Sequence, residues 1–118
     1  GLGDVYKRQG FNYLRIRRAA KIVDNEEFEA LIRTGQLIDL RDPAEFHRKH
    51  ILGARNIPSS QLKTSLAALR KDKPVLLYEN QRAQRVTNAA LYLKKQGFTE
   101  IYILSYGLDS WKGKVKTS

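Results

Sequence analysis

Short apolar runs alternate along the chain with segments of helical spacing. The runs at 37–40, 74–78 and 101–104 are too short for helices and predict buried strands. A weaker strand is predicted at 54–57, where Pro58 ends it. Apolar residues three and four positions apart predict helices over 24–35, from 43 onward, over 60–71 and over 83–96, and a terminal turn or helix over 108–111. This alternation predicts an α/β fold with a central, mainly parallel sheet of about five short strands flanked by helices.

Capping residues indicate where these helices begin and end. Asp24 with Glu27 three residues later forms a capping-box pattern, and Gly35 is the expected C-cap of the same helix. Pro43 fits the first position of the next helix. Gly97 follows the last long helix and is expected to end it.

Composition limits the chain to one soluble-type domain. It has 118 residues, of which 42% are hydrophobic and 29% charged, proportions of a globular domain with one core. No apolar run approaches the ~18 residues of a membrane span, and no signal peptide is evident. The chain has no cysteine, which excludes disulfides and thiolate metal sites.

The net charge of +10 is concentrated at the amino end, where residues 1–21 contribute half of it. Residues 1–9 resemble a translated sequencing adaptor, and the alternative is a disordered terminus. Residues 10–21 place two aromatic residues before a group of arginines, the pattern that flanks a membrane helix on its cytoplasmic side. The alternative is a solvated basic tail. Nucleic-acid binding is disfavoured because the aromatic residues follow the apolar periodicity and do not alternate with the basic ones.

Two sequence blocks carry the most specific signal. Residues 39–46 read Asp-Leu-Arg-Asp-Pro-Ala-Glu-Phe, and residues 50–58 read His-Ile-Leu-Gly-Ala-Arg-Asn-Ile-Pro. Both blocks resemble those of rhodanese-like domains, and the resemblance covers about residues 22–113, with 114–118 as a tail. The carboxyl-terminal part agrees through Gly97, Phe98, Ile101, Leu104, Gly107 and Trp111, whereas Tyr106 replaces the first glycine of a pair. The resemblance implies the three-layer fold of that family and points to its single-domain bacterial members.

The resemblance also implies which residues support the site. Asp39 and Arg41 are expected at the carboxyl end of a strand, where they would form a buried pair that braces the neighbouring loop. The alternative is direct contact with a ligand. The full set expected to give structural support is Asp39, Arg41, Glu45, His50, Asn56 and Trp111. His47 and His50 lack a third histidine or cysteine to complete a metal site, so neither a metal nor a cofactor is expected.

The loop after residue 78 departs from the family at its most important position. Active members have Cys-x-x-Gly-x-Arg there, and the backbone N–H groups stabilise a thiolate or persulfide. Counting forward from the strand places Glu79 at the cysteine. Counting back from the helix places Asn80 there instead, with Ala83 at the glycine and Arg85 at the arginine; this register fits the helix better and implies one extra residue in the strand. Both registers remain open, and a glycine-to-alanine change at Ala83 restricts the loop if it requires positive φ.

No residue of this loop is a nucleophile suited to sulfur transfer. There is no cysteine, serine or threonine between Glu79 and Val86, and Ser59 and Ser60 are expected to cap the following helix. The loop is still a candidate cradle for a small anion, and the alternative is that its arginines are solvated. The candidate residues are Asn80, Gln81, Arg82, Ala83, Gln84 and Arg85.

These observations predict a rhodanese-like pseudoenzyme that acts as a non-catalytic binding or regulatory module for an unknown protein partner. We expect a cytoplasmic location, with a segment upstream of residue 10 holding the domain to the inner face of the plasma membrane. One alternative is an accessory domain that assists sulfur transfer with a partner's thiol. The other is a basic domain that binds nucleic acid or anionic lipid through residues 15–21.

Overall fold

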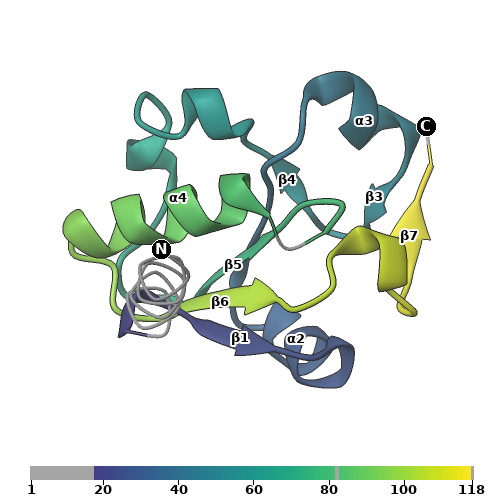
Figure 1. The fold of residues 1–118 in the computed structure, drawn as a ribbon, viewed down its shortest axis with the longest axis horizontal. Coiled ribbons are helices and arrows are strands. Elements are labelled where there is room, and N and C mark those ends of the chain that lie inside the picture. Colours follow the sequence, from purple (N-terminus) through teal and green to yellow (C-terminus); the bar gives the residue numbers. More distant parts are fainter. Residues whose placement is uncertain (1–17, 82, 118) are drawn as a thin grey trace, which may run out of the picture.

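A computed structural model describes residues 18–81 and 83–117 of the chain. Its centre is a five-stranded sheet in which all neighbouring strands are parallel (Figure 1). The strand order is β1-β6-β5-β2-β4. These strands are β1 (Lys21–Val23), β2 (Gln36–Asp39), β4 (Arg55–Asn56), β5 (Val75–Tyr78) and β6 (Ile101–Leu104). Two further strands, β3 (His50–Ile51) and β7 (Val115–Lys116), pair with each other in antiparallel orientation.

Helices cover both faces of the sheet. The described residues include the α-helices α2 (Asn25–Ile32), α3 (Pro43–Arg48) and α4 (Gln84–Lys95), and the 3₁₀ turns η1 (Ser59–Gln61), η2 (Leu66–Ala68) and η3 (Leu108–Ser110). In Figure 1, α4 and α2 lie on opposite sides of the strands. The α/β fold with a parallel sheet of five short strands is therefore confirmed.

The apolar run of the central strand β5 is continuous because both faces of the strand are buried. Val75 and Leu77 belong to the buried cluster beneath α4, whereas Leu76 and Tyr78 belong to the cluster around Phe28 of α2. Successive side chains of a strand point to opposite faces, so a strand covered on both faces is apolar at every position. All four residues are fully buried. The residues that follow continue the same alternation into the loop.

The predicted helix over 60–71 is wrong. The structure has the two 3₁₀ turns η1 and η2 there, and the cap before η1 is Pro58, without a side-chain capping bond from Ser59 or Ser60. Thr64 donates through its hydroxyl to the Gln61 carbonyl. Hydroxyl side chains compete in this way for backbone groups, which weakens a helix despite its apolar spacing.

Several boundaries also differ from the sequence-based expectation. The helix predicted to end at Gly35 ends at Ile32, with Arg33 as its C-cap. A Cβ on Gly35 would overlap the Leu76 side chain, so this glycine allows close packing, and its N–H donates to the Leu31 carbonyl at 2.9 Å, two residues beyond the C-cap. The strands β1, β3 and β7 have two or three residues, too few to show a periodicity. β7 lies within the segment 114–118 that the sequence suggested was a tail.

The amino-terminal predictions lie largely outside the described residues. The adaptor-like segment 1–9 and the aromatic and arginine-rich part of 10–17 are among the residues that the structure does not describe. Within the described ranges, no helix combines the length and the apolar character needed to cross a bilayer.

Candidate functional site

The candidate site lies where β2 and β5 end side by side. Asp39 pairs with Tyr78 in the register of these parallel strands, so the residues that follow them emerge at the same edge of the sheet. The loop from Glu79 to Ala83 joins β5 to α4 at this edge, which lies on the right of the sheet in Figure 1. Open α/β sheets form their ligand crevices at the carboxyl ends of strands.

Asp39 and Arg41 form a buried ion pair at this edge. Nη2 of Arg41 lies 2.8 Å from Oδ2 of Asp39, and its Nε donates to Oδ1 at 3.0 Å. The two residues are 0% and 4% exposed. Burial alone would lower the pKa of Arg41, but the hydrogen bonds and the negative charge of Asp39 outweigh it and raise that pKa above its ordinary value. The guanidinium of Arg41 therefore stays positively charged.

Neighbouring groups hold this pair in place. The side-chain amide of Asn56 donates to the carbonyl oxygens of Asp39 and Arg41, at 3.1 Å and 2.9 Å. The hydroxyl of Tyr78 accepts a hydrogen bond from the backbone N–H of Ile51 at 3.1 Å. Burial, together with the nearby Asp39 carboxylate, raises the pKa of Tyr78 well above its usual value. The phenol is accordingly neutral.

Asn80 connects the loop to this buried pair. Its Oδ1 accepts from Nη1 of Arg41 at 2.9 Å, and its Nδ2 donates to Oε2 of Glu45 at 2.9 Å. Asn80 itself is exposed. The amide thus bridges a cation and a carboxylate and fixes the start of the loop against α3.

Glu79 points the other way, into the loop. Its side chain is 8% exposed, and its Oε2 accepts a hydrogen bond from the backbone N–H of Val86 at 2.9 Å. Val86 lies in the first turn of α4, where backbone N–H groups have no intrahelical acceptor and the helix dipole favours negative charge. The protein's own carboxylate therefore occupies an anion-binding position at this helix end.

Arg85 already has negatively charged neighbours. Its guanidinium nitrogens lie 4.0 Å from a carboxylate oxygen of Asp42 and 4.0 Å from one of Glu45. Gln81 and Gln84 form hydrogen bonds with Asp109 and Asn88. Arg82 lies outside the described residues.

Ala83 does not need the conformational freedom of glycine. Its φ is −135°, an extended conformation that any residue adopts. In the register that places Asn80 at the cysteine, the replacement of the family's glycine by Ala83 therefore imposes no backbone strain on this loop.

Two of the expected support residues lie away from the loop. Nδ1–H of His50 donates to the Phe46 carbonyl at 2.8 Å, and its ring stacks on that of Phe46. The Trp111 ring meets the Phe28 ring edge-on, with 5.9 Å between their centres. These contacts support α3 and α2 and do not touch the candidate site.

Gly107 is a site residue whose role the sequence did not reveal. Its φ is +70°, and an added Cβ would lie 2.4 Å from the carbonyl oxygen of Asn80. The following residues close over the loop, because the backbone N–H groups of Leu108 and Asp109 donate to the carbonyls of Glu79 and Asn80, at 2.8 Å and 3.0 Å. The agreement with a family glycine was the only signal available beforehand.

Comparisons with known proteins agree with this architecture. A family model described as "Rhodanese-like domain" matches residues 24–114. The protein YqhL of Bacillus subtilis (strain 168) is 50% identical over 105 residues, covering 89% of this chain and 82% of that protein. The thiosulfate sulfurtransferase GlpE of Stutzerimonas stutzeri (strain A1501) is 35% identical over 95 residues, covering 78% of this chain and 84% of that enzyme. A rhodanese-related protein from Thermoplasma volcanium shares the fold, with a TM-score of 0.75 at 23% identity over 83% of this chain and 99% of that one.

The chain belongs to the rhodanese-like domain family. It is related to thiosulfate sulfurtransferases, and it has no cysteine.

Proposed function

We propose that this protein is a non-catalytic binding or regulatory module of the rhodanese-like family. The observation that carries the proposal is the hydrogen bond from the Val86 N–H to the Glu79 carboxylate, in the loop where active relatives would hold a sulfur. The position in the loop that would bind an anion is occupied by the protein's own Glu79 carboxylate. An incoming thiosulfate would have to displace this buried carboxylate and overcome its repulsion.

The chemistry of the side chains supports the same conclusion. Sulfur transfer in this family passes through a persulfide on a thiolate, and the chain contains no thiol. The described part of the loop also offers no hydroxyl. A carboxylate or an amide at this position holds no transferable sulfur.

The geometry favours Glu79 over Asn80 as the position that corresponds to the cysteine. Glu79 is buried and reaches the amino end of α4, whereas Asn80 is exposed and contacts Arg41 and Glu45 on the other side of the loop. A sulfur stabilised by backbone N–H groups would lie on the side of the loop that faces the amino end of α4, as the Glu79 carboxylate does.

A small anion in the loop remains a prediction. Against it stand the two carboxylates near Arg85, which would compete with an anion for its charge, and the carboxylate of Glu79 itself. The predicted attachment to the inner face of the plasma membrane rests on the aromatic and arginine pattern of residues 10–21 alone. The genomic sequence upstream of residue 10 tests it, since about 20 consecutive apolar codons are required.

The proposal is tested by a thiosulfate:cyanide sulfurtransferase assay on the purified full chain, with an active thiosulfate sulfurtransferase as positive control. We expect no thiocyanate above the rate of a protein-free blank. Activity that disappears in Arg85→Ala or Arg82→Ala would overturn the proposal. Adding glutathione as an external thiol distinguishes the accessory alternative, because a stimulation that Arg85→Ala abolishes would favour it.

A further inference from the structure

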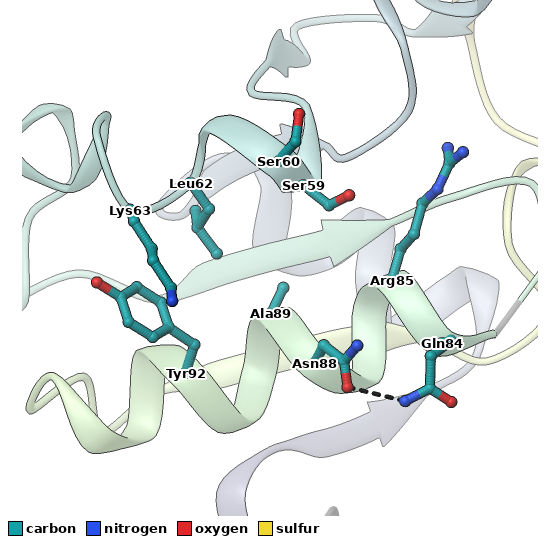
Figure 2. A pocket seen from close by; sticks show the side chains of 9 residues that line it. All are labelled: Ser59, Ser60, Leu62, Lys63, Gln84, Arg85, Asn88, Ala89 and Tyr92. Carbon is teal, nitrogen blue, oxygen red and sulfur yellow. Dashed lines mark hydrogen bonds between the residues drawn. The ribbon is translucent and has the colours of Figure 1, made fainter.

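A groove separates η1 from the amino-terminal half of α4, beside the loop but outside it (Figure 2). Its volume is about 280 Å³. This lies near the lower limit of small-molecule sites, which begin at roughly 300 Å³. The groove therefore accommodates a compact organic molecule.

The floor of the groove is apolar. Leu62 comes from the segment after η1, and Ala89 and Tyr92 come from α4. Ala89 and Tyr92 are three residues apart on the helix, so their side chains lie on the same face. Leu62 and Ala89 are buried, and Tyr92 is half-buried with one part of its ring open to the groove. This floor suits a flat or short aliphatic body.

The rim of the groove is polar and positively charged. Lys63 and Arg85 lie at opposite ends, with the side chains of Ser59, Ser60 and Asn88 between them (Figure 2). None of the described residues that line the groove is acidic. The electrostatic potential inside the groove therefore favours an anion.

The two cations are not equivalent. Arg85 lies 4.0 Å from carboxylate oxygens of Asp42 and Glu45, so a ligand's anion would compete with these two groups for its charge. Lys63 forms no ion pair with any described residue, and its Nζ lies 5.6 Å from the centre of the Tyr92 ring. This cation–π contact holds the ammonium over the apolar floor. Lys63 is accordingly the group available to a ligand's negative charge.

We propose that this groove binds a small organic anion, a carboxylate or phosphate monoester attached to a compact apolar body. The anionic group meets Lys63, and the body packs on Leu62, Ala89 and Tyr92. The groove would be a ligand site of the binding module proposed above, and its biological role rests on that proposed function. Whether the groove binds an anion is tested separately, because the titration and the sulfurtransferase assay can fail independently.

Titration of the ¹⁵N-labelled full chain, followed by NMR, tests this site. Phenyl phosphate and benzoate are the probes. The controls, at matched ionic strength, are inorganic phosphate, which lacks the apolar body, and benzyl alcohol, which lacks the negative charge. We expect the two aromatic anions to shift saturably the amide signals of residues 59–63 and 84–92. Inorganic phosphate and benzyl alcohol are expected to leave these signals nearly unchanged.

Two lysine variants distinguish binding in the groove from a non-specific effect of the protein's positive charge. Lys63→Gln should weaken phenyl phosphate binding about fivefold, the effect of losing a partly exposed ion pair. Lys71→Gln is the matched control, since Lys71 also lies over an aromatic ring, 5.9 Å from the centre of Phe98 and outside the groove. An equal effect of the two variants, absence of saturable shifts, or shifts caused equally by inorganic phosphate would overturn the proposal. Both lysines are exposed, so neither variant is expected to disturb folding.

Discussion

The carboxylate of Glu79 closes the loop on itself by accepting a hydrogen bond from the Val86 N–H, 2.9 Å away. These partners are seven positions apart in sequence, and both are buried. The contact satisfies one of the free N–H groups at the start of α4 and places a negative charge at the positive end of the helix. The Glu79 side chain thus stabilises the loop.

Cysteine substitutions distinguish the two positions of the loop. In Glu79→Cys the thiol faces the amino end of α4, which stabilises the thiolate and lowers its pKa below the ordinary value of about 8.5. In Asn80→Cys the thiol lies between Arg41 and Glu45, whose opposite charges largely cancel. The pH profile of alkylation by iodoacetamide measures both values. A lower midpoint in Asn80→Cys than in Glu79→Cys would show that the assigned register is wrong.

Breaking the buried ion pair should be costly. Asp39→Asn leaves the Arg41 guanidinium without its counter-charge in a buried setting, and we expect a loss of about 3–5 kcal/mol in the free energy of unfolding. Urea denaturation measures the loss. The matched control is Asp72→Asn, which breaks the exposed pair with Arg70 and should cost less than about 1 kcal/mol. Similar costs for the two variants would contradict a bracing role of Asp39.

Alanine variants of Gly107 and Gly53 distinguish the cost of a steric overlap from the cost of backbone strain. Both have positive φ, but an added Cβ on Gly107 meets the Asn80 backbone, whereas on Gly53 it meets nothing within 4 Å. Gly53→Ala should cost roughly 1–2 kcal/mol, the strain of a left-handed conformation. Gly107→Ala should cost at least about 3 kcal/mol, since it adds overpacking against the loop. Equal losses in urea denaturation would mean that Gly107 is required for its φ alone.

The raised pKa of Tyr78 leads to a prediction of how the free energy of unfolding changes at alkaline pH. Burial and Asp39 raise the pKa of its hydroxyl in the folded state, so above the ordinary value of about 10 the unfolded chain loses this proton first. Stability should therefore fall as pH rises beyond about 10, with this residue contributing up to about 1.4 kcal/mol per pH unit. Tyr78→Phe removes that contribution and flattens the curve, as urea midpoints at successive pH values would show. Tyr106→Phe, at a tyrosine that is 70% exposed, is the control and should keep the wild-type slope. An unchanged slope in Tyr78→Phe would contradict the raised pKa.

The sequence predicted the fold well because its strongest signals come from burial. β5 and β6 are continuous apolar runs, and the apolar face of α4 repeats at helical spacing through Val86, Ala89, Ala90 and Leu93. The segment 60–71 has the same spacing but forms 3₁₀ turns, and the hydroxyl of Thr64 bonds to its backbone there. The strand β7 is too short to produce any pattern.

The site was predictable as a location but not as a set of contacts. The sequence indicated that Asp39, Arg41 and the loop would meet at one edge of the sheet. It could not decide between Glu79 and Asn80, because the two differ in the side of the loop to which they point, and a shift of one residue reverses that side. Nor could it show that the carboxylates of Asp42 and Glu45 lie beside Arg85, since those contacts depend on tertiary packing.

The most direct test of the occupied loop is the effect of thiosulfate on thermal unfolding of the wild-type chain and of Glu79→Ala, at ionic strength held constant with sodium chloride. Removing the carboxylate frees the Val86 N–H at a helix terminus, and an anion that binds there stabilises the folded state. We predict that thiosulfate raises the melting temperature of Glu79→Ala and leaves that of the wild type unchanged. An equal rise in both proteins, or a rise in the wild type alone, would contradict the conclusion that Glu79 fills the anion position of this loop.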